Sequence, residues 1–272
     1  MLRLFGFIAL ALGLAASASA QTRPLLTEEA ETAPAGTLVL EVGLDAIKNE
    51  PNFLTGRRRD RYDGPVLRAI FSPANNVEMD VEWTTRVGVH GDPDFGSLSD
   101  FGDVSLRAKV RLLSSPDSRW TLGARFGVTL PETGGEQGLG PNALRMLAQM
   151  LASSHIGSTA LHANAGLAIH DEIDSPPAQQ DFLAYGLAAS RPFRQDLAVV
   201  AEVAGLLGPS VPGVAARSEA RLGVRLKRAH LTGDLALRRG LAQADGSWGL
   251  SFGVSLHSRN GGAAATQAPG GP

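Results

Sequence analysis

Six histidines are the residues of this sequence best suited to catalytic or metal chemistry. They are His90, His155, His162, His170, His230 and His257. Their separations do not match a zinc site, and the chain has no cysteine that could complete one. A P-loop and a G-x-S-x-G nucleophile motif are also absent from the sequence. We therefore predict neither a metal site nor a cofactor.

His162 and Asn164 come nearest to a nucleophilic site. A catalytic serine needs a histidine that takes its proton and a third group that orients the histidine. In TALHANAGLAI the two polar residues alternate with Leu161, Ala163 and Ala165, and no serine follows His162 at the second position. We expect both side chains to form hydrogen bonds on the polar face of a strand, and we predict that the chain is not an enzyme.

Charged residues at every second position are the stronger signal. VEMDVEW, at 77–83, alternates apolar with acidic residues, which is the period of a β-strand. FGDVSLRAKVRL, at 101–112, alternates apolar with basic residues. The charged positions that we predict to share one face are Glu78, Asp80, Glu82, Arg107, Lys109, Arg111, Arg125, Glu202, Arg217, Arg221, Arg225, Lys227 and Asp234.

The elements that must position these charges are strands of about ten residues with a polar and an apolar face, which is typical of a transmembrane β-barrel. The predicted strands are 37–47, 65–72, 77–89, 101–112, 120–130, 142–154, 159–169, 181–191, 197–207, 216–227, 230–238 and 248–257. The fold class is therefore all-β, an antiparallel up-and-down barrel of about twelve strands over 37–258.

The connections between these strands alternate strictly between long and short. The long stretch 47–64 is followed by SPANN, the long stretch 90–100 by SSPDS, and PETGGEQGLGPN by SHIGS. Outer-membrane barrels show this alternation because their periplasmic turns are short and their outer loops are long. A soluble periplasmic β-protein, the alternative, has no reason to sort its loops in this way.

The segment 142–154 is ambiguous. NALRMLAQMLASS has leucines at helical spacing, and Pro141 could start a helix. A helix here would leave an odd number of strands, whereas bacterial single-chain barrels have even numbers. Parity favours a strand, and a short helix in the outer loop or the pore remains the alternative.

In a lipid-embedded barrel the apolar face contacts lipid and the polar face lines the lumen. We therefore expect Glu78, Asp80 and Glu82 to face inward and to meet Arg107, Lys109 and Arg111 on the next strand. Two interpretations stay open: the charges neutralise one another in a filled interior, or they shape the field of an open pore.

The two ends of the chain fall outside the predicted barrel. Residues 1–20 have a cation at Arg3, an apolar core and a closing Ala-Ser-Ala, which indicates a secretory signal cleaved before Gln21, with a retained anchor as the alternative. Residues 259–272 lack apolar residues and are predicted to be a disordered tail. The net charge of −2 gives no support to nucleic-acid binding.

Residues 21–36, QTRPLLTEEAETAPAG, precede the first strand on the periplasmic side. We hypothesise that they fold into the mouth of the barrel as a plug. Arg23, Thr27, Glu28 and Glu29 are the candidate plug residues, and the two glutamates would pair with inward cations such as Lys109, Arg111 or Arg225. A flexible leader is the alternative.

The same stretch resembles a known family. Arg23, Pro24, Leu25, Thr27, Glu28, Glu29 and Gly36 are similar to the opening of the MetA-pathway of phenol degradation family of outer-membrane proteins. Further similar positions are Gly102, Asp103 and Lys109, Leu130, Pro131, Thr133 and Gly134, and Asn164 and Gly166. The resemblance implies an outer-membrane barrel that passes small aromatic or hydrophobic compounds.

The leading hypothesis is thus a passive channel or transporter for small molecules in a bacterial outer membrane, in contact with lipid and a small solute. The second is a closed structural or ligand-holding barrel without transport, and the third is a lipid-active enzyme. The sequence decides neither the solute nor the oligomeric state.

Overall fold

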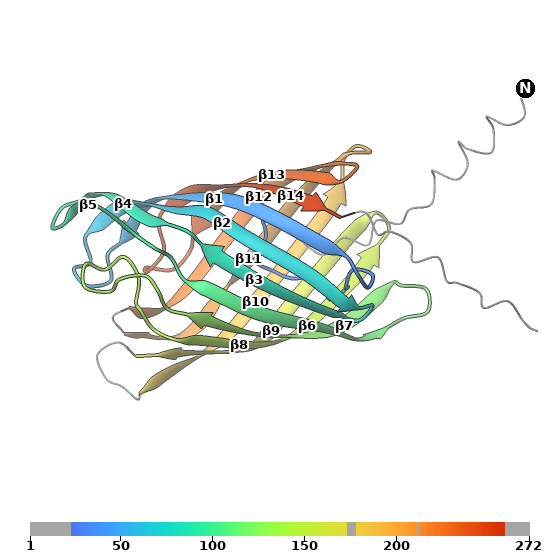
Figure 1. The fold of residues 1–272 in the computed structure, drawn as a ribbon, viewed down its shortest axis with the longest axis horizontal. Coiled ribbons are helices and arrows are strands. Elements are labelled where there is room, and N and C mark those ends of the chain that lie inside the picture. Colours follow the sequence, from blue (N-terminus) through green and yellow to red (C-terminus); the bar gives the residue numbers. More distant parts are fainter. Residues whose placement is uncertain (1–22, 173–177, 212, 259–272) are drawn as a thin grey trace, which may run out of the picture.

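The computed structural model describes residues 23–172, 178–211 and 213–258. These residues form one antiparallel sheet and no helix (Figure 1). Among them, no helix is long and apolar enough to span a membrane. The predicted signal sequence, 1–20, and the predicted tail, 259–272, lie outside the described residues.

Fourteen strands are defined among the described residues. They are β1 (Leu38–Pro51), β2 (Arg58–Ala74), β3 (Val77–Thr84), β4 (Val87–Asp92), β5 (Gly96–Asp100), β6 (Val104–Ser114), β7 (Trp120–Leu130), β8 (Arg145–Ile156), β9 (Thr159–Asp171), β10 (Gln179–Pro192), β11 (Leu197–Val211), β12 (Val214–Arg228), β13 (Leu231–Gly240) and β14 (Trp248–His257).

The strands close into a barrel because β1 pairs with β2 on one side and with β14 on the other. β3 and β4 both pair with β2 and are separated only by residues 85–86, and β5 and β6 are separated only by residues 101–103. Each of these pairs is one wall strand with an interruption. The wall therefore has twelve strands, and the predicted up-and-down barrel is confirmed.

The ambiguous segment forms β8, so the strand prediction is confirmed and the helix alternative is wrong. β8 pairs with β9 along its whole length and with β7 from Arg145 to Ser154. Met146 and Met150 are exposed on the outside, whereas Leu151 is buried inside. The barrel needs a strand to supply hydrogen bonds between β7 and β9, and this need overrides the helical spacing of the leucines.

Two stretches predicted as long loops are partly wrong. β1 continues to Pro51, β2 starts at Arg58, and the stretch 90–100 contributes to the β4–β5 hairpin. Polar side chains sustain these extensions: the ammonium of Lys48 pairs with Asp60, and Arg59 Nη1 lies 2.8 Å from Asp92 Oδ2. The short connections, the start of β1 and the end of β14 share one end of the barrel, called here the turn end. The opposite end is called the loop end.

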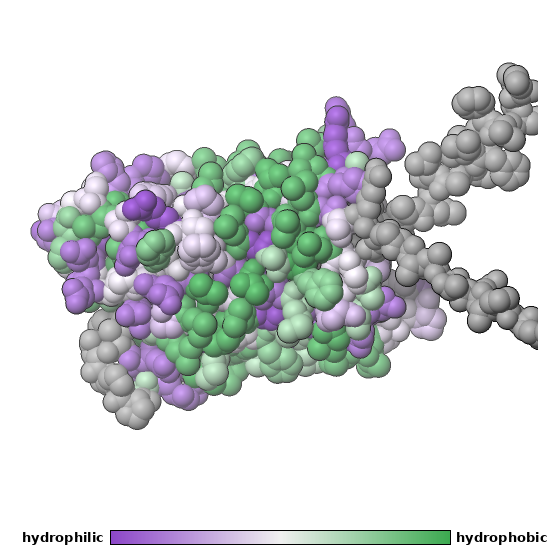
Figure 2. Space-filling view, in the orientation of Figure 1, coloured by the Kyte–Doolittle hydropathy of each residue, from purple (hydrophilic) through white to green (hydrophobic). Residues whose placement is uncertain are grey.

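The apolar face of the strands points outward. Large side chains on this face are exposed, among them Leu40 (47%), Met79 (55%) and Phe126 (56%). Figure 2 shows hydrophobic residues gathered over the middle of the barrel and hydrophilic residues around the end formed by β4 and β5. A belt of this kind is the surface that lipid covers in transmembrane barrels.

The interior is mainly polar, with three small apolar clusters among the described residues. In the largest of them Ala168, Phe182, Ala184 and Val214 are buried together on β9, β10 and β12. The remaining buried side chains include many acids and arginines, which are rarely buried unless they are paired. The inside of the barrel is therefore where this sequence places its chemistry.

Candidate functional site in the barrel lumen

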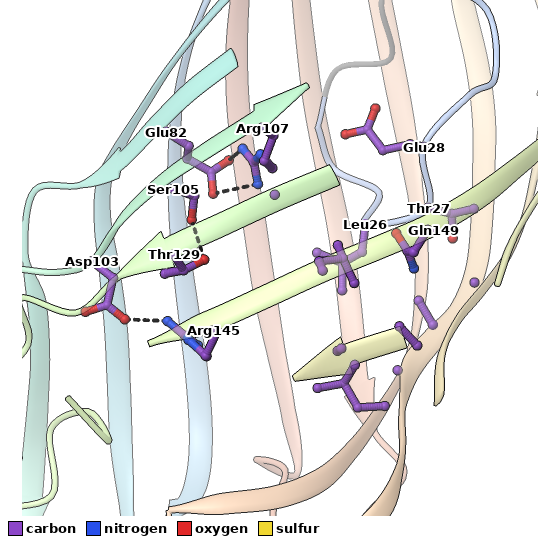
Figure 3. A pocket seen from close by; sticks show the side chains of 18 of the residues that line it. Leu26, Thr27, Glu28, Glu82, Asp103, Ser105, Arg107, Thr129, Arg145 and Gln149 are labelled. Atoms are coloured by element: carbon purple, nitrogen blue, oxygen red, sulfur yellow. Dashed lines mark hydrogen bonds and ion pairs between the residues drawn. The ribbon is translucent and has the colours of Figure 1, made fainter. Parts of the chain in front are cut away.

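The acidic residues of β3 and the basic residues of β6 meet inside the barrel. Lys109 Nζ lies 2.6 Å from Glu78 Oε2, and Arg107 Nε lies 2.7 Å from Asp80 Oδ1. Arg107 Nη2 also lies 2.8 Å from Glu82 Oε2 (Figure 3). The strand register places Glu78 opposite Lys109 and Asp80 opposite Arg107. These ion pairs between β3 and β6 form because both sets of charged side chains face the lumen and the two strands pair antiparallel.

Arg111 and Arg68 depart from the sequence-based arrangement. Arg111 does not join the acidic ladder; its Nη2 donates to the backbone oxygen of Asn75 at 3.0 Å near the turn end. Arg68 of β2 joins instead, with Nε 3.0 Å from Asp80 Oδ1. Sequence reasoning missed Arg68 because 65–72 alternates weakly, although its position between Leu67 and Ala69 gives the inward phase.

The second basic set is spread along β12. Arg221 Nε lies 3.6 Å from Glu202 Oε1, and the guanidinium of Arg221 also pairs with Glu219. Arg217 Nη1 lies 3.1 Å from Glu50 Oε1 near the loop end. The other two basic residues of this set are Arg225 and Lys227. Arg225 is buried opposite Asp234 in the strand register, and Lys227 is exposed near the turn end.

Residues 23–36, called here the lumen segment, cross the interior of the barrel. The backbone amides of Leu26 and Thr27 donate to the Glu202 carboxylate at 2.8 and 2.9 Å. The Glu28 amide donates to Asn164 Oδ1 at 2.7 Å, and Asn164 Nδ2 donates back to the Glu28 carbonyl at 3.1 Å. Wall side chains thus satisfy backbone groups that would otherwise be buried without partners.

Further along the lumen segment the same pattern continues. The amide of Ala30 donates to Ser153 Oγ at 2.8 Å, and the amide of Ala33 donates to Glu78 Oε1 at 2.6 Å. Gly186 leaves room for the segment, because a Cβ at this position would lie 2.6 Å from Thr27 Oγ1. The lumen segment is therefore fitted to the wall by both bonding and shape.

Glu28 is the electrostatic centre of the lumen segment. Its carboxylate lies 3.0 Å from Arg68 Nη2, 3.3 Å from Arg125 Nη2 and 3.9 Å from Lys109 Nζ. Burial alone would raise the pKa of Glu28, but the positive charges of Arg125, Arg68 and Lys109 outweigh it and lower the pKa well below its usual range. Glu28 is therefore ionised at neutral pH and binds the segment to three wall strands.

Arg23 and Glu29 are the remaining candidate plug residues. The Arg23 guanidinium pairs with Asp45 on β1, and Arg225 Nη2 donates to the Arg23 carbonyl at 3.1 Å. Glu29 is half-buried; burial raises its pKa, and the positive charges of Arg225 and Lys109 oppose that rise. Lys109 thus contacts Glu28 as expected, whereas Arg111 contacts neither plug glutamate.

A serine does approach His162, from the neighbouring strand. Ser153 Oγ and His162 Nδ1 are 2.9 Å apart, and both side chains are buried. The sequence around His162 does not reveal this partner. Ser153 lies earlier in the chain, on β8, and only the register between β8 and β9 brings the two side chains together. The Ser153 oxygen accepts the Ala30 amide, so in this arrangement the pair holds the lumen segment.

A cavity of about 560 Å³ lies within the barrel. Its lining includes Leu26, Thr27 and Glu28 of the lumen segment together with Arg107 of the wall (Figure 3). Arg125 of the wall also lines it. This volume is in the range of pockets that hold small molecules, roughly 300–1,000 Å³. In the described part of the chain, no three His, Asp or Glu side chains are placed to hold a metal ion.

We expect Asn164→Leu to loosen the lumen segment. Two hydrogen bonds worth roughly 1 kcal/mol each would be lost, which raises the detached population about thirtyfold. The chain has no cysteine, so Thr32→Cys gives a single buried reporter whose maleimide labelling rate measures detachment. Gln149→Leu is the matched control, because Gln149 lines the cavity without a hydrogen bond to the described part of the segment. Equal labelling in the two variants would contradict the prediction.

Comparison with solved structures shows the fold. The translocator domain of the autotransporter NalP from Neisseria meningitidis matches with a TM-score of 0.51 and 12% sequence identity, over 81% of this chain and 88% of that chain. At this identity the likeness shows a barrel of the outer-membrane type and nothing about activity.

Two further outer-membrane proteins match with lower TM-scores. They are an active-site mutant of outer membrane phospholipase A from Escherichia coli (TM-score 0.45, 11% identity, 87% of this chain and 93% of that chain) and the toluene transporter TodX from P. putida (TM-score 0.42, 10% identity, 83% and 90%). No protein-family model and no curated protein matches the sequence. The resemblance to the MetA-pathway of phenol degradation family therefore stays a prediction.

Proposed function

We propose that this chain is a passive transporter of small molecules in a bacterial outer membrane, and that the lumen segment is its gate. The outward apolar belt and the charged interior support a membrane location, with the turn end in the periplasm. The family resemblance suggests aromatic or hydrophobic solutes. No catalytic role is proposed for any residue.

One observation carries this proposal: the lumen segment is bound to the wall through side chains up to Ala35, and its backbone hydrogen bond to the wall, from the Gly36 amide to the Ser72 carbonyl at 2.7 Å, lies at its end beside β1. The amides of Leu26, Thr27, Glu28, Ala30, Ala33 and Ala35 all donate to side-chain oxygens. The wall strands keep their own backbone pairing throughout. The segment can therefore leave the lumen without breaking the sheet, and its departure would join the cavity to the turn end.

A closed, ligand-holding barrel is the second candidate function. The observation in its favour is the buried ion-pair cluster around Glu28, because removing one partner of a buried pair costs about 3–5 kcal/mol. In this alternative the lumen segment stays bound and the cavity exchanges ligand at the loop end alone.

A reversible crosslink separates the two candidates. Thr27→Cys combined with Gly186→Cys would place two Cβ atoms about 3.3 Å apart, close to disulfide geometry. We expect uptake of small solutes by proteoliposomes to fall strongly when the pair is oxidised and to recover on reduction. Each single-cysteine variant is a matched control and should not respond to oxidant.

Two results would argue against the gate. Uptake that is unchanged by the crosslink would mean that solutes pass around the lumen segment. Absence of uptake from oxidised and reduced protein alike, with the heat-dependent gel shift of a folded barrel retained, would favour the closed, ligand-holding barrel.

A further inference from the structure

The cavity has two chemically different walls. Among the described residues that line it, those on β9, β10 and β11 include no Asp, Glu, Lys or Arg. That side presents Ala168, Ala184, Ala204 and Leu206, backed by the apolar cluster around Phe182, and its uncharged polar members include Asn164 and His170. Leu26 of the lumen segment also borders the cavity and is half exposed. This wall suits an apolar group of a ligand.

The adjoining wall is polar and positively charged. On β6, β7 and the start of β8 it presents Ser105, Arg107, Thr129 and Arg145 (Figure 3). Arg125 of β7 belongs to the same wall. Around the whole cavity, the described lining residues include eight arginines but only five Asp and Glu side chains. Acids behind the lining, such as Asp80 and Glu219, pair with several of these arginines. An anion is therefore favoured over a neutral or cationic solute where an arginine has few such partners.

Arg125 is the cation on this wall with the weakest compensation. Its guanidinium is buried, and its one ion pair with a described residue is to Glu28 at 3.3 Å. Glu28 is shared with Arg68 and Lys109, so one carboxylate serves three cations. Arg107, by comparison, has both Asp80 and Glu82. A guanidinium presents five N–H donors, so Arg125 retains donors for a second carboxylate.

We propose that the cavity binds a small amphipathic anion: an aromatic or short aliphatic carboxylate whose charge contacts Arg125 and whose apolar body lies against Ala168, Ala184 and Leu206. This inference names the solute class for the proposed transport function and rests on it. It restricts the proposed aromatic or hydrophobic solutes to those that also carry a negative charge.

Binding to the folded barrel in detergent tests the inference without any membrane. The probes are benzoate, benzyl alcohol and acetate, which separate the charge from the ring, and titration calorimetry gives their dissociation constants. We expect benzoate to bind about tenfold more tightly than benzyl alcohol because of the charge-assisted hydrogen bonds, and about tenfold more tightly than acetate because of the apolar contact.

Variants assign the effect to Arg125. Arg125→Gln should abolish the preference for benzoate over benzyl alcohol, and Arg125→Lys should retain much of it. Arg111→Gln removes the same charge from the adjacent strand but does not touch the cavity, so it should leave the preference intact. The heat-dependent gel shift verifies that each variant is folded.

The outcomes are distinguishable from those of the transport experiment. Equal affinity for benzoate and benzyl alcohol, or the same loss in Arg111→Gln as in Arg125→Gln, would overturn the anion site even if solutes cross the barrel. Selective benzoate binding by a barrel that takes up no solute would support the site and overturn the proposed transport.

Discussion

Deletion of residues 22–34 is expected to raise the conductance of the barrel in planar bilayers by roughly tenfold, because the chain that crosses the lumen would be gone. The wall should survive the deletion, since β1 starts at Leu38 and pairs with β2 and β14 through its own backbone. Any anion preference set by the cavity should weaken, because Leu26, Thr27 and Glu28 form part of its lining.

The control for this deletion replaces residues 22–34 by a Gly-Ser chain of equal length. That variant keeps a tether of the same length but loses the native side chains of residues 22–34 and the fit to Glu202, Asn164 and Ser153. We expect it to conduct nearly as well as the deletion. If the deletion conducts no more than the intact protein while still folding, the lumen segment is not the barrier.

Glu28→Gln is expected to release the lumen segment although it changes only one polar group. The substitution leaves Arg68, Arg125 and Lys109 around an uncharged amide, and loss of one partner of a buried ion pair costs about 3–5 kcal/mol. That energy corresponds to a rise of more than about a hundredfold in the detached population. Labelling of Thr32→Cys measures the release.

Two comparisons make the Glu28 result specific. Glu31→Gln makes the same chemical change in the same segment, but the Glu31 carboxylate has no hydrogen-bond partner among the described residues, so labelling should barely change. Adding Arg125→Gln to Glu28→Gln should restore part of the docking, because it removes one uncompensated cation. If Glu28→Gln and Glu31→Gln label equally fast, the cluster does not hold the segment.

The pH dependence of this docking has a definite sign. The pKa of Glu28 is lowered in the docked state, so its contribution is fully present above the pKa of the free side chain and is lost only as the pH falls through the lowered value. We therefore expect the intact lumen segment to stay docked under mildly acidic conditions that already protonate an exposed glutamate.

The wall was predictable from the sequence because the alternation within each strand shows which of its residues face the lumen and which face outward. Alternation alone places Met79 and Trp83 outside and Glu78 and Asp80 inside, and parity decides β8 against the helical spacing of its leucines. The β4–β5 hairpin was not predictable in this way, because it extends beyond the apolar belt and is held by polar pairs such as Arg59 with Asp92.

The site was predictable only where its partners lie on strands with a clear pattern. Glu78 and Lys109 meet because strong alternation fixes both phases and the short turn fixes their depth. Arg68 was missed because 65–72 alternates weakly, and Ser153 because only the strand register brings it to His162. Their other partners, Glu28 and Ala30, lie in a segment with no periodic pattern. Which wall residues such a segment contacts depends on the closed shape of the barrel.

Assembly of this chain has an order imposed by its connectivity. β1 is continuous with the lumen segment, yet the wall is complete only when β14, made last, pairs with β1 along residues 39–48 and 248–257. The side chains that hold the segment come from β3, β8, β9, β11 and β12, in both halves of the chain. Full docking must therefore follow the formation of β12, although the segment is synthesised before every strand. During biogenesis, a docked lumen segment therefore indicates that the wall strands that hold it have formed.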